Sequence, residues 1–137
     1  MRAKEVVLGI TGSIAAYKAC DLVRLYRRKG FNVSCVMTRE AEAFITPLTL
    51  ESLSGNKVYT DMFALPENRT PQHVSLGDRA DIIVICPASA NVIGKLANGI
   101  CDDLLTCTCM ASTAPVLVAP AMNTNMYANK MVLKNVE

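Results

Sequence analysis

Four short runs of apolar and β-branched residues recur along the chain, and each is typical of a strand buried on both faces of a parallel sheet. These runs cover residues 6–10, 32–38, 82–86 and 116–119. Between them apolar residues return every three or four positions, which predicts helices over 15–28, 73–79, 90–97 and 103–111. The alternation of strands and helices predicts right-handed crossovers and an α/β fold: a three-layer α/β/α sandwich with a parallel, flavodoxin-like or Rossmann-like sheet.

Three segments have a less regular pattern. Residues 40–54 indicate a helix or a broken helix that restarts at Pro47, because proline suits the first helical position. Residues 61–72 contain two prolines and no sustained period, so we expect a loop there. The end of the chain is expected to be helical. A length of 137 residues corresponds to one domain with a real core.

Charge and composition exclude several classes of partner. The net charge of +2 is too small to indicate nucleic acid or a membrane surface, and no stretch is apolar enough to span a bilayer. The first residues run directly into a predicted strand, so they do not form a signal peptide. A basic cluster at 24–29 falls at the end of a predicted helix, where it complements the helix dipole. A hydrophobic content of 51% suggests some burial between subunits.

Six cysteines and one histidine do not form a metal-binding pattern. Cys35 and Cys86 fall in predicted core strands, where a free thiol packs as a small hydrophobic group. The pair Cys107 and Cys109 is not a C-x-x-C motif. We therefore expect no metal site and a reduced, cytosolic (cytoplasmic) protein.

Three loops made of small and amide residues each follow a predicted strand and precede a helical pattern. They are residues 9–14 (GITGSI), 87–91 (PASAN) and 120–123 (PAMN). In an open α/β sheet, ligands bind where the carboxyl ends of strands meet helix N-termini. In the first loop Gly12 permits close backbone approach and Ser13 can cap a helix, which suits a phosphate. An ordinary capped strand-to-helix turn remains the alternative.

The loops differ from the common nucleotide motifs. Thr11 and Ile14 stand where the dinucleotide fingerprint has glycine, and no Walker A sequence is present. Ser89, Asn91 and Asn123 add neutral hydrogen-bonding groups, although Asn123 could simply form an Asx turn. With no pair of catalytic acids among them, the loops indicate a cofactor that performs the difficult step.

His73 is the only histidine, so any imidazole chemistry depends on it. It begins a predicted helix after a loop, where it can face a pocket and transfer a proton near neutral pH. A surface or capping role is the simpler alternative.

Four segments of the sequence carry a resemblance to a known family. They are residues 9–18 (GITGSIAAYK), 73–81 (HVSLGDRAD), 87–106 (PASANVIGKLANGICDDLLT) and 120–127 (PAMNTNMY). Together they resemble the homo-oligomeric flavin-containing cysteine decarboxylases over essentially the whole chain. Within that family the chain is most similar to the members that act on 4′-phosphopantothenoylcysteine in coenzyme A biosynthesis. The resemblance implies FMN held at a subunit interface of a homotrimer or a trimer-based dodecamer.

The resemblance also implies roles for individual residues. The FMN-binding positions would be Gly12, Ser13, Ile14, Thr38, Ser89, Ala90, Asn91 and Ala121. His73 and Asn123 match the catalytic positions, and Asn123 would hold the substrate carboxylate with Met122 beside it. In the implied reaction the flavin oxidises the cysteine thiol, CO₂ leaves, and the flavin returns the electrons to give 4′-phosphopantetheine. His73 would act as a base or orient charge in the first half.

Related decarboxylases continue into a flap that covers the substrate and carries a proton-donating cysteine. This sequence ends at Glu137 without a match to that cysteine, so we expect one FMN-binding domain over residues 1–137 that lacks the flap. Three alternatives stay open. One is a relative acting on a peptidyl cysteine or another acid, and another is a non-catalytic flavin-fold subunit that binds a phosphatase. The third is a nicotinamide-dependent reductase in which Glu40 holds ribose hydroxyls, which the missing glycines disfavour.

Overall fold

A four-stranded parallel sheet forms the centre of the protein. The computed structural model describes residues 2–137. The strands are β1 (Glu5–Ile10), β2 (Asn32–Met37), β3 (Ile82–Ala88) and β4 (Val116–Pro120). Their order across the sheet is β2-β1-β3-β4, so the chain turns to one side after β1 and to the other side for β3. The carboxyl ends of β1 and β3 therefore flank the point where ligands bind in open α/β sheets.

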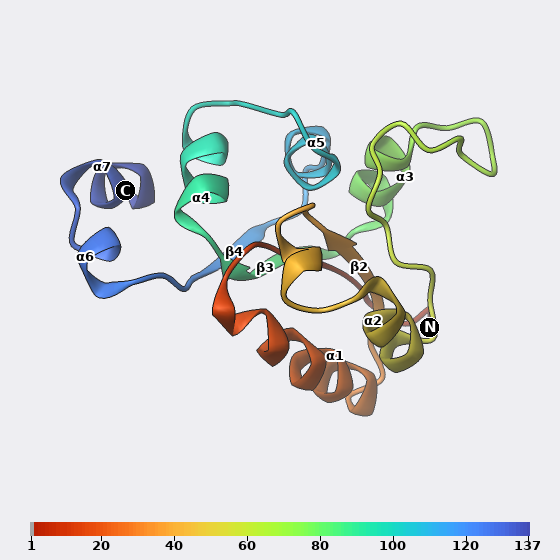
Figure 1. Cartoon of the computed structure of the whole chain (residues 1–137). Helices are drawn as coiled ribbons and strands as arrows, with labels where there is room; N and C mark the ends of the chain where they lie inside the picture. Colours follow the sequence, from red (N-terminus) through yellow and green to blue (C-terminus); the bar gives the residue numbers. More distant parts are fainter. Residues whose placement is uncertain (1) are drawn as a thin grey trace.

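Helices cover both faces of the sheet, which confirms the three-layer sandwich (Figure 1). The helical elements are η1 (Ile14–Tyr17), α1 (Lys18–Arg28), η2 (Ala41–Ala43), α2 (Pro47–Ser54), α3 (Gln72–Arg79), α4 (Ala90–Ala97), α5 (Leu104–Ala111), α6 (Thr124–Tyr127) and α7 (Lys130–Val136). Helices α1 and α2 lie on one face, and α3, α4 and α5 lie on the other (Figure 1). The broken helix predicted over 40–54 is confirmed, with Pro47 at the start of α2.

The two cores on either side of the sheet meet at β1, which is buried along its whole length. Leu8 belongs to the core under α1 and α2, whereas Val7 belongs to the core under α3, α4 and α5. Helix α5 packs directly on β1: a Cβ atom built on Gly9 would lie 2.5 Å from Cδ1 of Leu105. The absence of a side chain at residue 9 thus lets the helix approach the strand.

A polar cluster ties the C-terminal end of α3 to the sheet. Glu5 is buried and accepts hydrogen bonds from Ser34 Oγ (2.6 Å) and Asn32 Nδ2 (2.5 Å). Arg79, the last residue of α3, has its Nε 3.6 Å from Glu5 Oε1 and donates to Ser34 Oγ (2.9 Å). A buried carboxylate needs such partners, since an unpaired charge in the core is costly.

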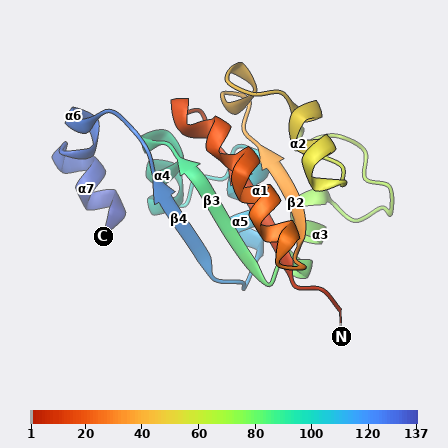
Figure 2. The ribbon, with the colours of Figure 1, turned by 90° about the horizontal axis from the view of Figure 1, so that it is seen from below.

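The β4 edge of the sheet is much more open than its centre. Val116, Leu117 and Val118 are 41%, 56% and 37% exposed, although all three are apolar. Helices α6 and α7 lie beyond this edge, and α7 packs against α4 (Figure 2). No helix within residues 2–137 is both long and apolar enough to cross a bilayer.

Candidate functional site

The three predicted loops line one hollow at the carboxyl end of the sheet. Its volume is about 610 Å³, within the range of small-molecule sites. The lining residues come from the three loops, the following helices and the η2 region: Gly12, Ser13, Ile14, Ala15, Phe44, Ser89, Ala90, Ala121, Met122, Asn123 and Met126. Topology explains the convergence, because β1, β3 and β4 are neighbours and run in the same direction.

The first loop exposes backbone donors beside a glycine. Ser13 caps η1 by accepting a hydrogen bond from the Ala15 N–H (3.3 Å), and its own N–H donates to the Thr11 carbonyl (2.9 Å). The N–H groups of Gly12 and Ile14 have no acceptor among residues 2–137. A Cβ atom on Gly12 would lie 2.5 Å from Cβ of Glu40. The turn therefore fits only glycine and offers free donors at the start of a helical segment, a natural anion site.

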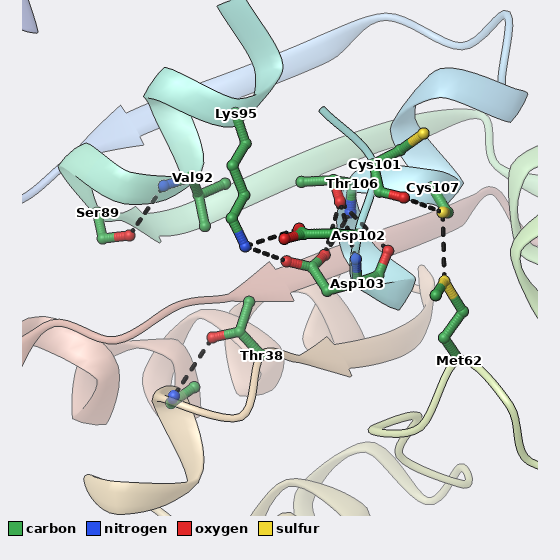
Figure 3. A network of polar contacts seen from close by, with 11 residues as sticks. Thr38, Met62, Ser89, Val92, Lys95, Cys101, Asp102, Asp103, Thr106 and Cys107 are labelled. Atoms are coloured by element: carbon green, nitrogen blue, oxygen red, sulfur yellow. Dashed lines mark hydrogen bonds and ion pairs between the residues drawn. The ribbon is translucent and has the colours of Figure 1, made fainter. Parts of the chain in front are cut away.

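The second loop repeats this arrangement at the start of α4. Ser89 Oγ accepts a hydrogen bond from the Val92 N–H (3.3 Å; Figure 3). The N–H groups of Ala90 and Asn91 have no acceptor in the described part of the chain, as expected in a first helical turn. Ser89 and Ala90 line the hollow, whereas the Asn91 side chain is exposed and does not. Within one chain, the Asn91 side chain thus lies outside the hollow.

The third loop places an amide group at the rim of the hollow. Asn123 Oδ1 accepts a hydrogen bond from the Asn125 N–H (2.8 Å), so the residue does form an Asx turn and starts α6. This bond uses one lone pair of the amide oxygen, fixes the orientation of the amide and leaves Nδ2 free to donate. The Ala121 N–H donates to the Ala88 carbonyl (3.1 Å), which holds this loop against the second one. Met122 also lines the hollow.

Thr38 lies in a different hollow from the three loops. It is buried at the end of β2, and its Oγ1 accepts a hydrogen bond from the Ala41 N–H (3.3 Å; Figure 3). The second hollow has a volume of about 580 Å³ and is lined by residues 37–39, 42, 60–63 and 102–104. Thr38 is nevertheless tied to the end of β1, since its N–H donates to the Ile10 carbonyl (3.0 Å).

His73 is also separate from the three loops. It is the second residue of α3, and its Nδ1 is buried without a hydrogen-bond partner among the described residues. It lines neither the hollow of the three loops nor the one beside Thr38. Helix α6 lies beyond the β4 edge of the sheet, whereas α3 lies on the side of the β2 edge (Figure 1). A single chain therefore does not bring His73 and Asn123, the two predicted catalytic residues, together.

A network of charged residues joins α4 to α5 beside the second hollow. Lys95 Nζ lies 2.9 Å from Asp102 Oδ1 and 3.1 Å from Asp103 Oδ2 (Figure 3). The hydrogen bond from Lys95 lowers the pKa of Asp102, and the same bond raises the pKa of Lys95. Asp103 also caps α5 by accepting from the Thr106 N–H (2.8 Å). The network fixes the turn between the two helices.

The thiols in the core are held protonated. Burial raises the pKa of Cys35 and of Cys109 to about 12. Cys107 Sγ contacts Met62 Sδ at 3.3 Å (Figure 3). Within residues 2–137, no three His, Cys, Asp or Glu side chains are grouped so that they could hold a metal ion.

The sequence interpretation did not single out three of the lining residues. Phe44 and Met126 are 50% and 48% exposed at the rim, and Ala15 follows the capping Ser13. For Met126 a signal existed, because it lies inside the segment 120–127 that carries the family resemblance. For Phe44 there was none, since an apolar residue in an irregular segment more often packs in the core.

A family model, curated relatives and solved structures all match this chain. The family model described as "Flavoprotein" matches residues 1–137. The "Coenzyme A biosynthesis bifunctional protein CoaBC" of Bacillus subtilis (strain 168) is 48% identical over 133 residues, which are 97% of this chain and 33% of that protein. The chain thus spans about a third of the length of such curated relatives.

Two solved structures show the same fold and similar sequences. The FMN-dependent cysteine decarboxylase SpaF superposes with a TM-score of 0.92 at 35% identity, over 97% of this chain and 77% of that one. A PPC decarboxylase variant complexed with pantothenoylaminoethenethiol superposes with a TM-score of 0.85 at 34% identity, over 98% of this chain and 76% of that one.

Proposed function

The chain belongs to the Flavoprotein family, among the FMN-dependent cysteine decarboxylases, and from this premise we propose that it decarboxylates 4′-phosphopantothenoylcysteine to 4′-phosphopantetheine in coenzyme A biosynthesis. One observation carries the proposal: two helix starts with free N–H groups and the free amide nitrogen of Asn123 surround the same hollow. Such a hollow can hold a phosphate-bearing cofactor and the carboxylate of a substrate together. That this chain carries out the activity of its longer relatives is itself part of the proposal.

The residues of the hollow fit FMN. The unpaired N–H groups of Gly12, Ile14, Ala90 and Asn91 can donate to phosphate and other oxygens of the cofactor. Gly12 lets this turn pack against Glu40, because any side chain at residue 12 would collide with that residue. We propose that Ser13, Ser89 and Ala121 complete the binding surface, as the family resemblance implies. Bound FMN would supply a reversible two-electron acceptor, so that the carbon bearing sulfur can be oxidised before CO₂ leaves and reduced afterwards.

Asn123 would hold the substrate carboxylate. Its Nδ2 is the free end of the amide, because Oδ1 already accepts the Asn125 N–H. A donor at this position orients the carboxylate without neutralising its charge by proton transfer, which would oppose CO₂ loss. Met122, beside it in the hollow, adds an apolar surface that excludes water.

His73 would act as the base or as the group that orients charge, and we propose that a neighbouring copy supplies it. Its Nδ1 is buried and has no hydrogen-bond partner among the described residues, so this nitrogen is available to a group from outside the chain. The separation of α3 from α6 within one chain supports a site shared between copies (Figure 1). The exposed apolar side chains of Ile14 (80%) and Met126 (48%) at the hollow support burial between copies. The assembly proposed is the homotrimer or trimer-based dodecamer that the family resemblance implies.

The proposal also covers Thr38, the cellular location and the partner. Thr38 stays a proposed FMN contact, reached from the second hollow. A cytosolic location fits the six free thiols of the described chain. The partner is a small-molecule substrate.

The test is the visible spectrum of the purified protein, followed without oxygen as phosphopantothenoylcysteine is added. We expect bound oxidised flavin whose bands bleach on addition, with loss of CO₂ seen by mass spectrometry. A protein that binds no flavin contradicts the proposal. Flavin that responds only to a peptide ending in cysteine would transfer the assignment to a peptidyl substrate, a second branch of cysteine decarboxylases.

A further inference from the structure

Thr11 lies at the junction between the first two loops of the site. It follows β1 directly and is completely buried, so it does not line the hollow. Its hydroxyl donates to the Pro87 carbonyl (2.6 Å) and accepts from the Ser89 N–H (2.8 Å). One hydroxyl group has one proton and two lone pairs, so it can make both bonds at once. Thr11 therefore joins two loops that are more than seventy residues apart in the sequence.

Backbone pairing does not reach this part of the sheet. The pairing of β1 with β3 ends at Gly9 and Ile85, and the register of β3 with β4 shifts between Ile85 and Ala88. Beyond these points no ladder bond holds the end of β1 to the end of β3 in the described chain. The Thr11 hydroxyl makes the two bonds that continue the connection.

Two backbone bonds complete the connection around Thr11. Its carbonyl accepts the Ser13 N–H (2.9 Å), which shapes the turn around Gly12. The Ala88 carbonyl, one residue before Ser89, accepts the Ala121 N–H (3.1 Å) and so reaches the third loop. Thr11 thus contacts the first two loops directly, and the Ala88 carbonyl connects the second loop to the third.

We propose that Thr11 is a positioning residue, whose buried hydroxyl sets the distance between the Gly12 turn and the start of α4 so that both address one phosphate-bearing ligand. The inference rests on the proposed function. Without the hydroxyl, the Pro87 carbonyl and the Ser89 N–H lose their partner, and a buried polar group without a partner is unfavourable. The loops then separate or admit water, and their free N–H groups no longer converge.

Three variants test this role. Thr11→Val keeps the shape of the side chain and removes both bonds, whereas Thr11→Ser keeps the hydroxyl and removes only a methyl group. Thr108→Val is a matched control, because Thr108 is equally buried and its hydroxyl donates only to Leu104 of its own helix (2.7 Å). The full chain, freed of flavin, is titrated with FMN and followed by flavin fluorescence, and the unfolding of each apo variant in urea is measured alongside.

We expect Thr11→Val to bind FMN at least tenfold more weakly and to shift the absorption bands of bound flavin. Thr11→Ser should bind within threefold of the wild type. Thr108→Val should lose stability without losing FMN affinity, which separates positioning from general destabilisation. Equal FMN binding by Thr11→Val and the wild type would overturn this inference alone, whereas a wild type that binds no FMN would overturn the proposed function with it.

A measurement on the wild type keeps the proposal testable if Thr11→Val does not fold. The Ser89 N–H should exchange with solvent as slowly as the Ala121 N–H, because each has a fixed acceptor. It should exchange far more slowly than the neighbouring Ala90 N–H, which has no acceptor in the described chain. Equally fast exchange of Ser89 and Ala90 would contradict the bridging role without any use of flavin.

Discussion

Gly12 and Glu40 are in such close contact that a Cβ atom on Gly12 would lie 2.5 Å from Cβ of Glu40. The turn after β1 and the segment after β2 therefore meet directly below the free N–H groups of the first loop. The contact makes Gly12 sensitive to the smallest possible substitution.

Gly12→Ala should weaken FMN binding at least about tenfold, equivalent to about 1.4 kcal/mol. The added methyl group must displace backbone, which moves the free N–H groups of the loop. Fluorescence titration of the apo protein with FMN measures the effect. Gly94→Ala is the control: its Cβ would meet only Asn135 Nδ2 at 3.5 Å, so the helix should gain about 0.5–1 kcal/mol with unchanged FMN binding. Unchanged FMN affinity in Gly12→Ala would show that the loop does not hold the cofactor.

Asn123→Asp should weaken recognition of the substrate carboxylate while the protein stays folded and binds FMN. The aspartate can still cap α6 through an oxygen, but it presents a negative charge where Nδ2 now donates. Loss of a hydrogen bond to a charged group, together with the repulsion, should raise KM by roughly tenfold or more. Steady-state decarboxylation and an FMN titration measure the two effects. A variant with normal KM would remove Asn123 from the substrate site.

Asp103→Ala should destabilise the protein by about 1–2 kcal/mol, because it removes the N-cap of α5 and the contact with Lys95. Asp103→Asn keeps a capping oxygen and should cost less. Asp102→Asn is the control, since Asp102 is 62% exposed and an exposed ion pair contributes little. Urea unfolding should rank the three variants in that order. If Asp102→Asn and Asp103→Ala lost equal amounts of stability, the effect would come from the charge and not from the cap.

Asp81 should make the stability of the protein depend on pH in acid. Its carboxylate accepts the Glu5 N–H (2.7 Å) and lies 3.0 Å from Arg2, and these contacts lower its pKa below the ordinary value of 3.8. The unfolded chain then takes up this proton at a higher pH than the folded one. The stabilisation is present above pH 3.8 and is lost as the pH falls through the lower pKa of the folded state.

Urea unfolding between pH 6 and pH 3 checks this expectation. Asp81→Asn should flatten the acid decline, whereas Asp78→Asn, at an exposed residue that forms no ion pair within residues 2–137, should leave the decline as in the wild type. If stability fell equally steeply with pH in both variants, Asp81 would not be the source of the acid decline.

The six thiols should react with iodoacetamide in an order set by burial. Cys101 is exposed and should react first at pH 8. Cys35 and Cys109, with their pKa raised to about 12 by burial, should react only as the protein unfolds. Peptide mass spectrometry over time, with and without urea, measures the order. Early alkylation of Cys35 in the native protein would contradict its place in the core.

The regular part of the fold could be predicted because buried parallel strands have a simple signature. Uninterrupted apolar runs placed β1, β3 and β4 within one or two residues of their observed bounds. Pro47 marked the start of α2, and Gly30, with φ of +83°, marked the end of α1. The convergence of the three loops followed from the direction of the strands, since parallel strands present their carboxyl ends at one edge.

Other features depend on contacts that no local pattern encodes. In the sequence, Thr11 was notable only because it stands where the dinucleotide fingerprint has glycine. Its structural role was not visible, because the partners of its hydroxyl lie in a distant loop. Tyr59 pairs with β2 through a single bridge at Val36, too short to produce an alternating pattern. His73 was correctly placed at the start of a helix, but the side of the sheet that carries α3 is decided by its packing on α5. Its proposed catalytic role stays a prediction.

The capping bond of Asn123 makes the rim of the hollow selective by the direction of its hydrogen bonds. A free amide can rotate and offer either an acceptor or a donor, but this one can turn only by releasing the Asn125 N–H and uncapping α6. Rotation would cost about 1 kcal/mol, the usual value of an N-cap. With Oδ1 held by the Asn125 N–H, the rim favours groups that accept hydrogen bonds, such as carboxylates and carbonyls, over ammonium groups, which can only donate. The N-cap of one short helix thus influences whether the ligand group at the rim accepts or donates hydrogen bonds.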